Sequence, residues 1–141
     1  MASFNSSTYA GQTGTPRLAT LGSEMQVLSA SYEIGGTEST TDTINFLDIP
    51  AGWTVVGGGI WSDDCASAGT MSMNLGVSGS ASVLLAAHNL ASAGADAFLS
   101  GTFTPSATAA TTVIGTLTMA GVTLITGASI RVFCICVRIQ D

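Results

Sequence analysis

The sequence predicts an all-β protein: a single-domain β-sandwich or jelly-roll-like fold with one short helical insertion. The first indication is composition, because charged residues make up only 9% of the 141 residues, none of them lysine, while apolar residues make up 46%. Ordinary globular domains carry about 25% charged residues. Serine, threonine and glycine supply the polar positions instead, and they suit the outward positions and turns of short strands. The second indication is a period-two alternation of apolar and polar residues in several segments.

About eight segments carry this strand signal, each bounded by glycine, proline or another turn residue. In the clearest one, Leu28, Ala30, Tyr32 and Ile34 alternate with polar residues. The predicted strands are residues 26–34, 43–49, 53–61, 71–77, 97–103, 111–119, 122–125 and 129–140. The sequence contains no repeat of fixed period, so a solenoid or a propeller is not expected.

Two places depart from a regular strand pattern. Gly57-Gly58-Gly59 interrupts the strand at residues 53–61, which predicts a bulge or a bend where another backbone or ring comes close. Residues 80–92 are predicted to contain a short helix. The apolar residues that fit one helical face there are Val83, Leu84, Ala87 and Leu90.

The strand at residues 129–140 is apolar on both faces, which predicts a central strand or one whose second face is covered by another subunit. Phe133, Ile135, Val137 and Ile139 lie on one face, and Ile130, Val132, Cys134 and Cys136 lie on the other. We therefore expect a homo-oligomer. The residues assigned to its interface or to the core are Phe133, Ile135, Val137, Ile139, Trp53 and Trp61, with the two tryptophans on one face of their strand.

Residues 1–20 differ from residues 21–141, which we assign to the sandwich. This segment is polar, rich in glycine, threonine and serine, and without periodicity. It is either a frayed terminus or an extended arm that becomes ordered against a partner. The residues that would anchor such an arm are Phe4, Tyr9, Pro16 and Arg17.

The charge balance argues against nucleic-acid and membrane partners. The net charge is −6, and only Arg17, Arg131 and Arg138 could contact phosphates. An anionic membrane surface is disfavoured for the same reason. The first residues lack the basic and apolar regions of a secretory signal. The longest apolar run, residues 132–137, is too short to cross a bilayer.

Each catalytic or metal-binding pattern lacks parts. A Ser-His-Asp set would have to use His88, the single histidine, and the GxSxG, P-loop and HExxH motifs are missing from the sequence. Asp63-Asp64 is the one pair of adjacent acids, and a solvated turn is expected there because a Ca²⁺ site needs six to eight oxygen ligands. We expect no catalytic residue, no metal and no cofactor, and therefore not an enzyme.

The three cysteines are expected to be reduced, mostly buried thiols. Cys134 and Cys136 share one face of a strand but lie too far apart along it to bridge easily, and Cys65 lies in a loop-like stretch. A zinc site would require all three and His88 to converge, and the Cys-x-Cys spacing is not that of the usual zinc motifs.

Four short segments resemble small virion proteins of tailed bacteriophages: NFLDIPAG at residues 45–52, VVGG at 55–58, MNLGVS at 73–78 and TGASIRV at 126–132. The resemblance extends over roughly residues 26–139 and is a pattern of strands and turns. Above all, the chain is similar to capsid decoration, or cement, proteins. These are non-enzymatic β-sandwiches that commonly sit as trimers on the outside of an HK97-like shell.

The resemblance implies a partner, a location and a role for the N-terminal segment. The partner would be the major capsid protein, and the location would be the capsid surface of the virion after synthesis in the host cytoplasm. Residues 1–20 would be the capsid-contact arm, and the chain would form a homotrimer that bridges capsomers. With so few basic residues, purely electrostatic docking is not expected.

Two alternatives stay open. One is another virion component, such as a head fibre or a tail protein. The other is a carbohydrate-binding or adhesin module that uses Trp53 and Trp61 as a sugar-stacking platform, although such aromatics are more often core or subunit contacts.

Overall fold

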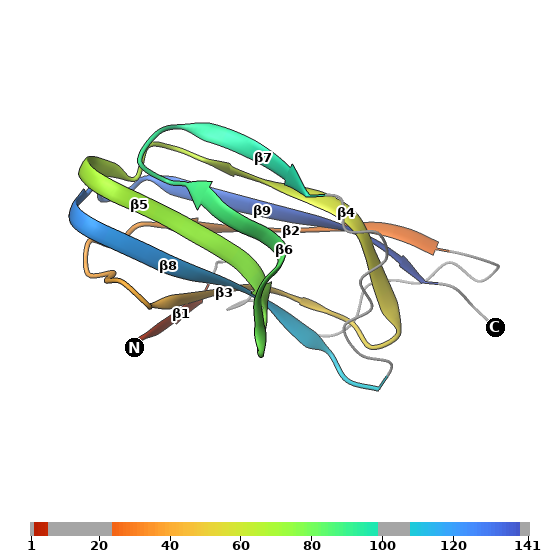
Figure 1. Ribbon diagram of the computed structural model, residues 1–141. Coiled ribbons are helices and arrows are strands. Elements are labelled where there is room, and N and C mark those ends of the chain that lie inside the picture. Colours follow the sequence, from red (N-terminus) through yellow and green to blue (C-terminus); the bar gives the residue numbers. More distant parts are fainter. Residues whose placement is uncertain (1, 6–23, 99–107, 139–141) are drawn as a thin grey trace.

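The chain forms two β-sheets packed face to face (Figure 1). The computed structural model describes residues 2–5, 24–98 and 108–138, and these contain nine strands and no helix. The strands are β1 (Ser3–Asn5), β2 (Glu24–Glu33), β3 (Thr43–Ile49), β4 (Trp53–Ser62), β5 (Ala66–Val77), β6 (Ser80–Asn89), β7 (Gly94–Phe98), β8 (Thr111–Leu124) and β9 (Ser129–Arg138). The predicted all-β sandwich is therefore confirmed.

The strands are divided between a five-stranded sheet, in the order β1-β3-β8-β5-β6, and a four-stranded sheet, in the order β2-β9-β4-β7. All neighbours pair antiparallel except β1 and β3, which are parallel. From β2 onward, consecutive strands lie in opposite sheets except for the β5–β6 hairpin, which turns at Ser78-Gly79. Chain crossings of this kind bring segments that are distant in the sequence together in one core.

The predicted helix within residues 80–92 is wrong, because residues 80–89 form the edge strand β6. Two register shifts in the β5–β6 pairing break the alternation of β6. As a result its buried residues, Leu84 and His88, are four positions apart, which imitates the spacing of a helix. At one irregularity Ala87 has a φ of 56°, and its N–H donates to Asn74 Oδ1 at 2.8 Å. Pairing with β5 therefore overrides the local apolar spacing.

Other strand boundaries differ from the prediction in length. The two strands expected at residues 111–119 and 122–125 are one strand, β8, and β5 begins earlier than predicted, at Ala66. The end of the strand predicted at 97–103 lies outside the described residues, as do Ile139 and Gln140.

The glycine triplet marks a bulge, as predicted. The pairing of β4 with β9 shifts between Val55 and Gly57, and this shift reverses the faces of the strand beyond it. Trp53 is consequently buried in the core while Trp61 lies on the outside, so the prediction that both share one face is wrong. A Cβ on Gly58 would lie 2.2 Å from the Phe133 carbonyl oxygen and 2.6 Å from the Phe98 ring, so only glycine fits there.

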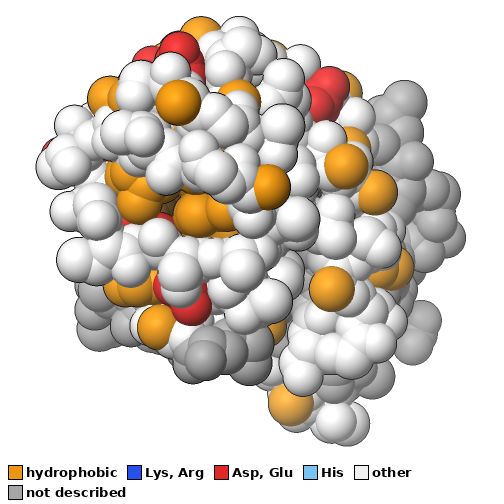
Figure 2. All heavy atoms as spheres, turned by 60° about the vertical axis from the view of Figure 1, so that its left-hand side comes forward, with side chains coloured by type: hydrophobic (Ala, Val, Ile, Leu, Met, Phe, Trp, Pro, Cys, Tyr) orange, Lys and Arg blue, Asp and Glu red, His pale blue; other side chains and the backbone are white. Residues whose placement is uncertain are grey.

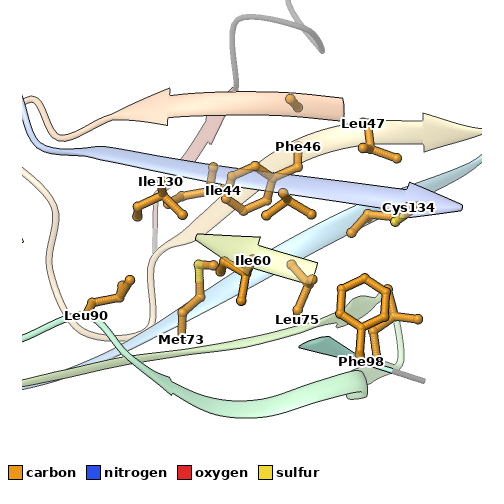
Figure 3. Close-up of a cluster of buried hydrophobic side chains, with 14 of the residues drawn as sticks. Ile44, Phe46, Leu47, Ile60, Met73, Leu75, Leu90, Phe98, Ile130 and Cys134 are labelled. Atoms are coloured by element: carbon orange, nitrogen blue, oxygen red, sulfur yellow. The ribbon is translucent and has the colours of Figure 1, made fainter. Parts of the chain in front are cut away.

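The core lies between the sheets and is closed by side chains from both (Figure 3). Strands β3 and β5 contribute Ile44, Phe46, Met73 and Leu75 from the five-stranded sheet, and these meet Ile60 of the other sheet. Strand β9 lies between β2 and β4, which confirms the predicted central strand. Its inward side chains, Ile130, Val132, Cys134 and Cys136, are fully or almost fully buried.

We expect Gly58→Ala to lower the free energy of unfolding by about 2–3 kcal/mol, because the new methyl group must displace the β9 backbone. Gly94→Ala is the matched control, since a Cβ there meets nothing within 4 Å, and its effect should stay within about 0.5 kcal/mol. Urea unfolding of both variants measures the difference. Equal stabilities would contradict the close approach at Gly58.

Candidate functional site

The largest candidate site is the outward face of the four-stranded sheet. Strands β2, β4 and β9 place six apolar side chains there: two cross-strand pairs between β2 and β9, a phenylalanine next along β9, and a tryptophan diagonal to it on β4. We call this surface the apolar outer face; its residues are Met25, Val27, Trp61, Phe133, Ile135 and Val137. Met25 is 72% exposed, Val27 58%, Trp61 44% and Phe133 41%.

Pairing positions place these residues side by side. Met25 is opposite Val137, and Val27 is opposite Ile135. Phe133 is opposite Gly59, where a Cβ would lie 2.9 Å from the phenyl ring, so the missing side chain leaves room for that ring over β4. The guanidinium of Arg131 lies 5.8 Å from the Trp61 ring centroid, which is a cation–π distance.

A shallow hollow of about 340 Å³ opens on the apolar outer face beside Phe133. It is lined by residues 29–31 of β2 and 131–133 of β9. The hollow therefore lies next to the exposed Met25 and Val27, further along the same two strands.

The outward face of the five-stranded sheet has the opposite character. Across β3, β8 and β5 it presents Thr43, Thr116 and Asn74 in one row, and Thr118 and Ser72 begin the next. Hydroxyl and amide side chains of this kind are well hydrated. One face of the sandwich is thus suited to water and the other is not.

Sequence reasoning identified only part of the apolar outer face. It named Phe133, Ile135, Val137 and Trp61, and missed Met25 and Val27. The alternation along β2 could have identified them, because residues 25 and 27 lie on the same side of the strand as Ser29 and Ser31, which face outward. Trp53, which was named with the others, belongs to the core.

A second candidate is a Ser-His-Asp line that the structure assembles around His88. The imidazole Nδ1 lies 2.6 Å from Asp96 Oδ2, and Nε2 lies 2.9 Å from Ser62 Oγ. Since a carboxylate only accepts, Nδ1–H donates to Asp96, and a neutral ring then accepts from the Ser62 hydroxyl. The sequence did not identify Ser62 or Asp96, which come from β4 and β7.

The exposure of this line is the reverse of what hydrolysis requires. Ser62 is 0% exposed and His88 3%, whereas Asp96 is 51% exposed. A nucleophilic serine must be reached by a substrate carbonyl, and here the serine is the most enclosed member. The line instead joins β6 of one sheet to β4 and β7 of the other.

A third polar cluster fastens the loop between β2 and β3. The Tyr32 hydroxyl donates to Glu38 Oε1 at 2.5 Å, and the N–H groups of Gly35 and Gly36 donate to the same carboxylate at 2.7 and 2.8 Å. Burial acts to raise the pKa of Glu38, but these hydrogen bonds outweigh it and lower the pKa. Burial and the hydrogen bond to Glu38 raise the pKa of Tyr32.

The N-terminal strand is tied to the end of this loop. The Ala2 N–H donates to Asp42 Oδ1 at 2.8 Å, and hydrogen bonds from Ala2 and Ser39 lower the pKa of Asp42. The Phe4 ring packs near Tyr32, with centroids 6.0 Å apart. Phe4 of the expected arm therefore lies on the sandwich itself, while Tyr9, Pro16 and Arg17 fall outside the described residues.

Asp63 and Asp64, the pair of adjacent acids, lie at a turn between β4 and β5. Asp63 accepts a hydrogen bond from Ser129 N–H at 3.0 Å and Asp64 from Ala66 N–H at 3.2 Å, which is the arrangement of a turn. Among the residues that the structure describes, no group of three His, Cys, Asp or Glu side chains could hold a metal ion.

The three cysteines are free and buried. Burial raises the pKa of the Cys65 and Cys134 thiols to about 12 and that of Cys136 to about 11, so they are unreactive in the folded protein.

On the side of the molecule drawn in Figure 2, a few separate carboxylates lie on an otherwise uncharged surface. Figure 2 shows mostly uncharged polar atoms there, with a few acidic and apolar side chains and no lysine or arginine among the described residues in view. Within residues 2–5, 24–98 and 108–138, no helix is long and apolar enough to cross a membrane.

Comparison with solved structures finds this fold in phage capsids. A chain in the capsid of Ralstonia phage GP4 matches with a TM-score of 0.74 and 17% identity over 99% of this chain and 100% of that chain. A chain in the cyanophage Pam1 capsid asymmetric unit matches with a TM-score of 0.66 and 24% identity over 92% and 95%. A chain in the acidic stable capsid of Helicobacter pylori bacteriophage KHP30 matches with a TM-score of 0.56 and 14% identity over 82% and 92%.

These similarities establish the fold as one found in phage capsid structures, which confirms the resemblance to phage virion proteins at that level. No protein-family model matches the sequence. No curated protein matches it either.

The buried Ser62–His88 pair predicts a specific stability effect. His88→Ala should lower the free energy of unfolding by about 2–4 kcal/mol, because it leaves a cavity and removes the partner of a buried hydroxyl. Asp96→Asn is the control: the half-exposed amide oxygen still accepts from Nδ1–H, so the loss should stay below about 1 kcal/mol. Urea titration measures both, and a His88→Ala loss as small as that of Asp96→Asn would refute the cross-sheet role.

The lowered pKa of Glu38 predicts a pH dependence of stability. Because the folded pKa lies below the unfolded value of about 4.3, ionised Glu38 contributes stability that is fully present above that pH and is lost as the pH falls through the folded pKa. The stability gap between wild type and Glu38→Gln should therefore be largest near pH 7 and narrow below about pH 4. Glu33→Gln, which removes an exposed carboxylate at the end of β2, is the control. A gap that stays constant with pH would contradict the assignment.

Proposed function

We propose that this chain is a structural virion protein of a tailed phage, and specifically a capsid decoration, or cement, protein. The observation that carries the proposal is a fold shared over 99% of this chain and 100% of a chain in a phage capsid structure. The match extends over almost all of both chains, so the shared feature is the whole sandwich and not a local substructure. The segments that resemble cement proteins point to the same class.

In this role the protein binds the outside of the head and stabilises it by bridging neighbouring capsomers. Its partner is the major capsid protein of an HK97-like shell, and it is made in the host cytoplasm and then becomes part of the capsid surface. Each contact can be weak, because a repeated lattice engages many copies and each bridging copy holds two sites. A homotrimer, as the resemblance suggests, would multiply these contacts.

The charge of the chain favours a particular mode of docking. With a net charge of −6 and no lysine, the protein has few basic side chains that could form ion pairs with carboxylates of a capsid. Docking is therefore assigned to the part of the N-terminal arm beyond β1, through Tyr9, Pro16 and Arg17, because Phe4 packs near Tyr32 on the sandwich. Contacts of this kind depend only weakly on salt, since screening acts on charge pairs.

The alternatives are favoured less. A sugar platform built from two tryptophans would need both on one surface, and Trp53 is in the core while Trp61 is outside. A head fibre or a tail protein would share the fold of a virion component but would be present in few copies per particle. Copy number in purified particles therefore separates a decoration protein from these components.

The test is decoration of particles that lack the protein. Wild-type protein should rebind at high copy number, measured by quantitative mass spectrometry, and should raise the temperature at which the particles release their DNA. The double variant Tyr9→Ala, Arg17→Ala leaves β1 untouched, so it should melt within a few degrees of wild type but bind poorly. Few copies of wild-type protein per particle would overturn the decoration role. Full occupancy by the double variant would place docking on the sandwich instead.

A further inference from the structure

We propose that the apolar outer face of the four-stranded sheet is covered by a second copy of this chain before the protein reaches its target. In this contact, Met25 and Val27 of one copy pack against Phe133 and its apolar neighbours on β9 of the next. Only one part of this inference rests on the proposed function, namely that the copies associate before they bind a capsid. The surface itself is defined by the described residues.

The first argument is that this surface does not suit water. Four large apolar side chains on the neighbouring strands β2, β9 and β4 are between 41% and 72% exposed, and Val56, at the β4 bulge, is 37% exposed. Scattered single apolar residues are normal on a protein surface, but a contiguous patch of this kind marks an interaction site. The opposite face of the same sandwich, with its rows of Thr, Ser and Asn, provides an internal comparison.

The second argument is charge. Two copies of a chain with a net charge of −6 repel each other unless the surfaces that meet lack carboxylates. Over residues 25–31 of β2 and 131–137 of β9, the paired stretch contains no acidic residue and a single arginine, Arg131. The apolar outer face is thus a place where two copies can approach without opposing like-charged carboxylates.

The third argument is area and shape. Three strands about 4.8 Å apart and about seven residues long give a face of roughly 330 Å² in projection, before side-chain relief is counted. A standard interface takes about 800 Å² of accessible surface from each partner, so this face supplies a large part of one. The hollow of about 340 Å³ on the same face has Ser29, Ser31 and Arg131 as its outward polar lining, so it forms a polar margin beside the apolar contact.

The choice of a second copy over the capsid follows from the order of events. A decoration protein exists free before it binds a finished shell, and a patch of this apolarity left open in the free protein would cause non-specific association. Interfaces between permanent partners are the more hydrophobic class, whereas surfaces that meet later resemble the rest of the exterior.

The first test is the association state of the purified protein in the absence of capsids. Wild type should sediment as an oligomer at micromolar concentration. Val27→Asp should weaken association by at least about 100-fold, because it places a charge in an apolar contact. Thr118→Asp puts the same charge on the exposed opposite face and should have no effect. Val27 is largely exposed in the single chain, so both variants should stay folded, with the wild-type far-UV circular dichroism spectrum.

The second test is a disulfide between copies. Tagged Met25→Cys is mixed with untagged Ser29→Cys and oxidised, and a cross-linked pair carrying one tag is expected on a non-reducing gel. The native cysteines do not compete because all three are buried. Replacing Ser29→Cys by Thr118→Cys should abolish the product.

Three results would overturn the inference: a monomeric wild type, an unaffected Val27→Asp variant, or equal dissociation by Val27→Asp and Thr118→Asp. The proposed function fails separately. An oligomer held by this face that does not decorate particles would contradict the decoration role alone, whereas a monomer that decorates them would contradict the inference alone.

Discussion

Strand β9 is the element on which the rest of the structure depends. It pairs along its length with β2 on one side and β4 on the other, so its backbone hydrogen bonds are satisfied on both edges. Its inward side chains complete the core between the sheets, and its outward side chains are apolar as well. A strand that is apolar on both faces is typical of one whose second face is also covered, and this is the basis of the proposed contact between copies.

The two outer faces of the sandwich show how a chain with few charges divides its surface. The five-stranded sheet is hydrated by hydroxyl and amide groups, and this replaces the charged surface of ordinary globular proteins. The four-stranded sheet has no such layer over Met25, Val27 and Phe133. In the proposed decoration role, the hydrated face would meet solvent and the apolar outer face would meet protein.

Hydrogen bonds of buried polar side chains connect loops and strands in this chain, a role that ion pairs often have in proteins with more charged residues. Glu38 collects three donors and holds the loop between β2 and β3, while His88 links β6 to the opposite sheet through Ser62. Glu38 and the Ser62–His88 pair are buried, and the hydrogen bonds of each connect separate parts of the sandwich. The line around His88 illustrates that matching residue types and distances do not make a catalytic site when the serine is enclosed.

The sequence by itself determined the all-β class, the strands around Leu28, Phe46 and Met73, the glycine bulge in β4 and the central position of β9. These features are local, because the alternation of side chains along one strand already states which residues face inward. The tertiary structure alone decided the rest. Bulges in the β5–β6 pairing turned a helical spacing into an edge strand, and the shift at Gly57 placed Trp53 inside and Trp61 outside. The apolar outer face likewise depends on which strands become neighbours, and pairing between segments distant in sequence is set by the packing of the whole core.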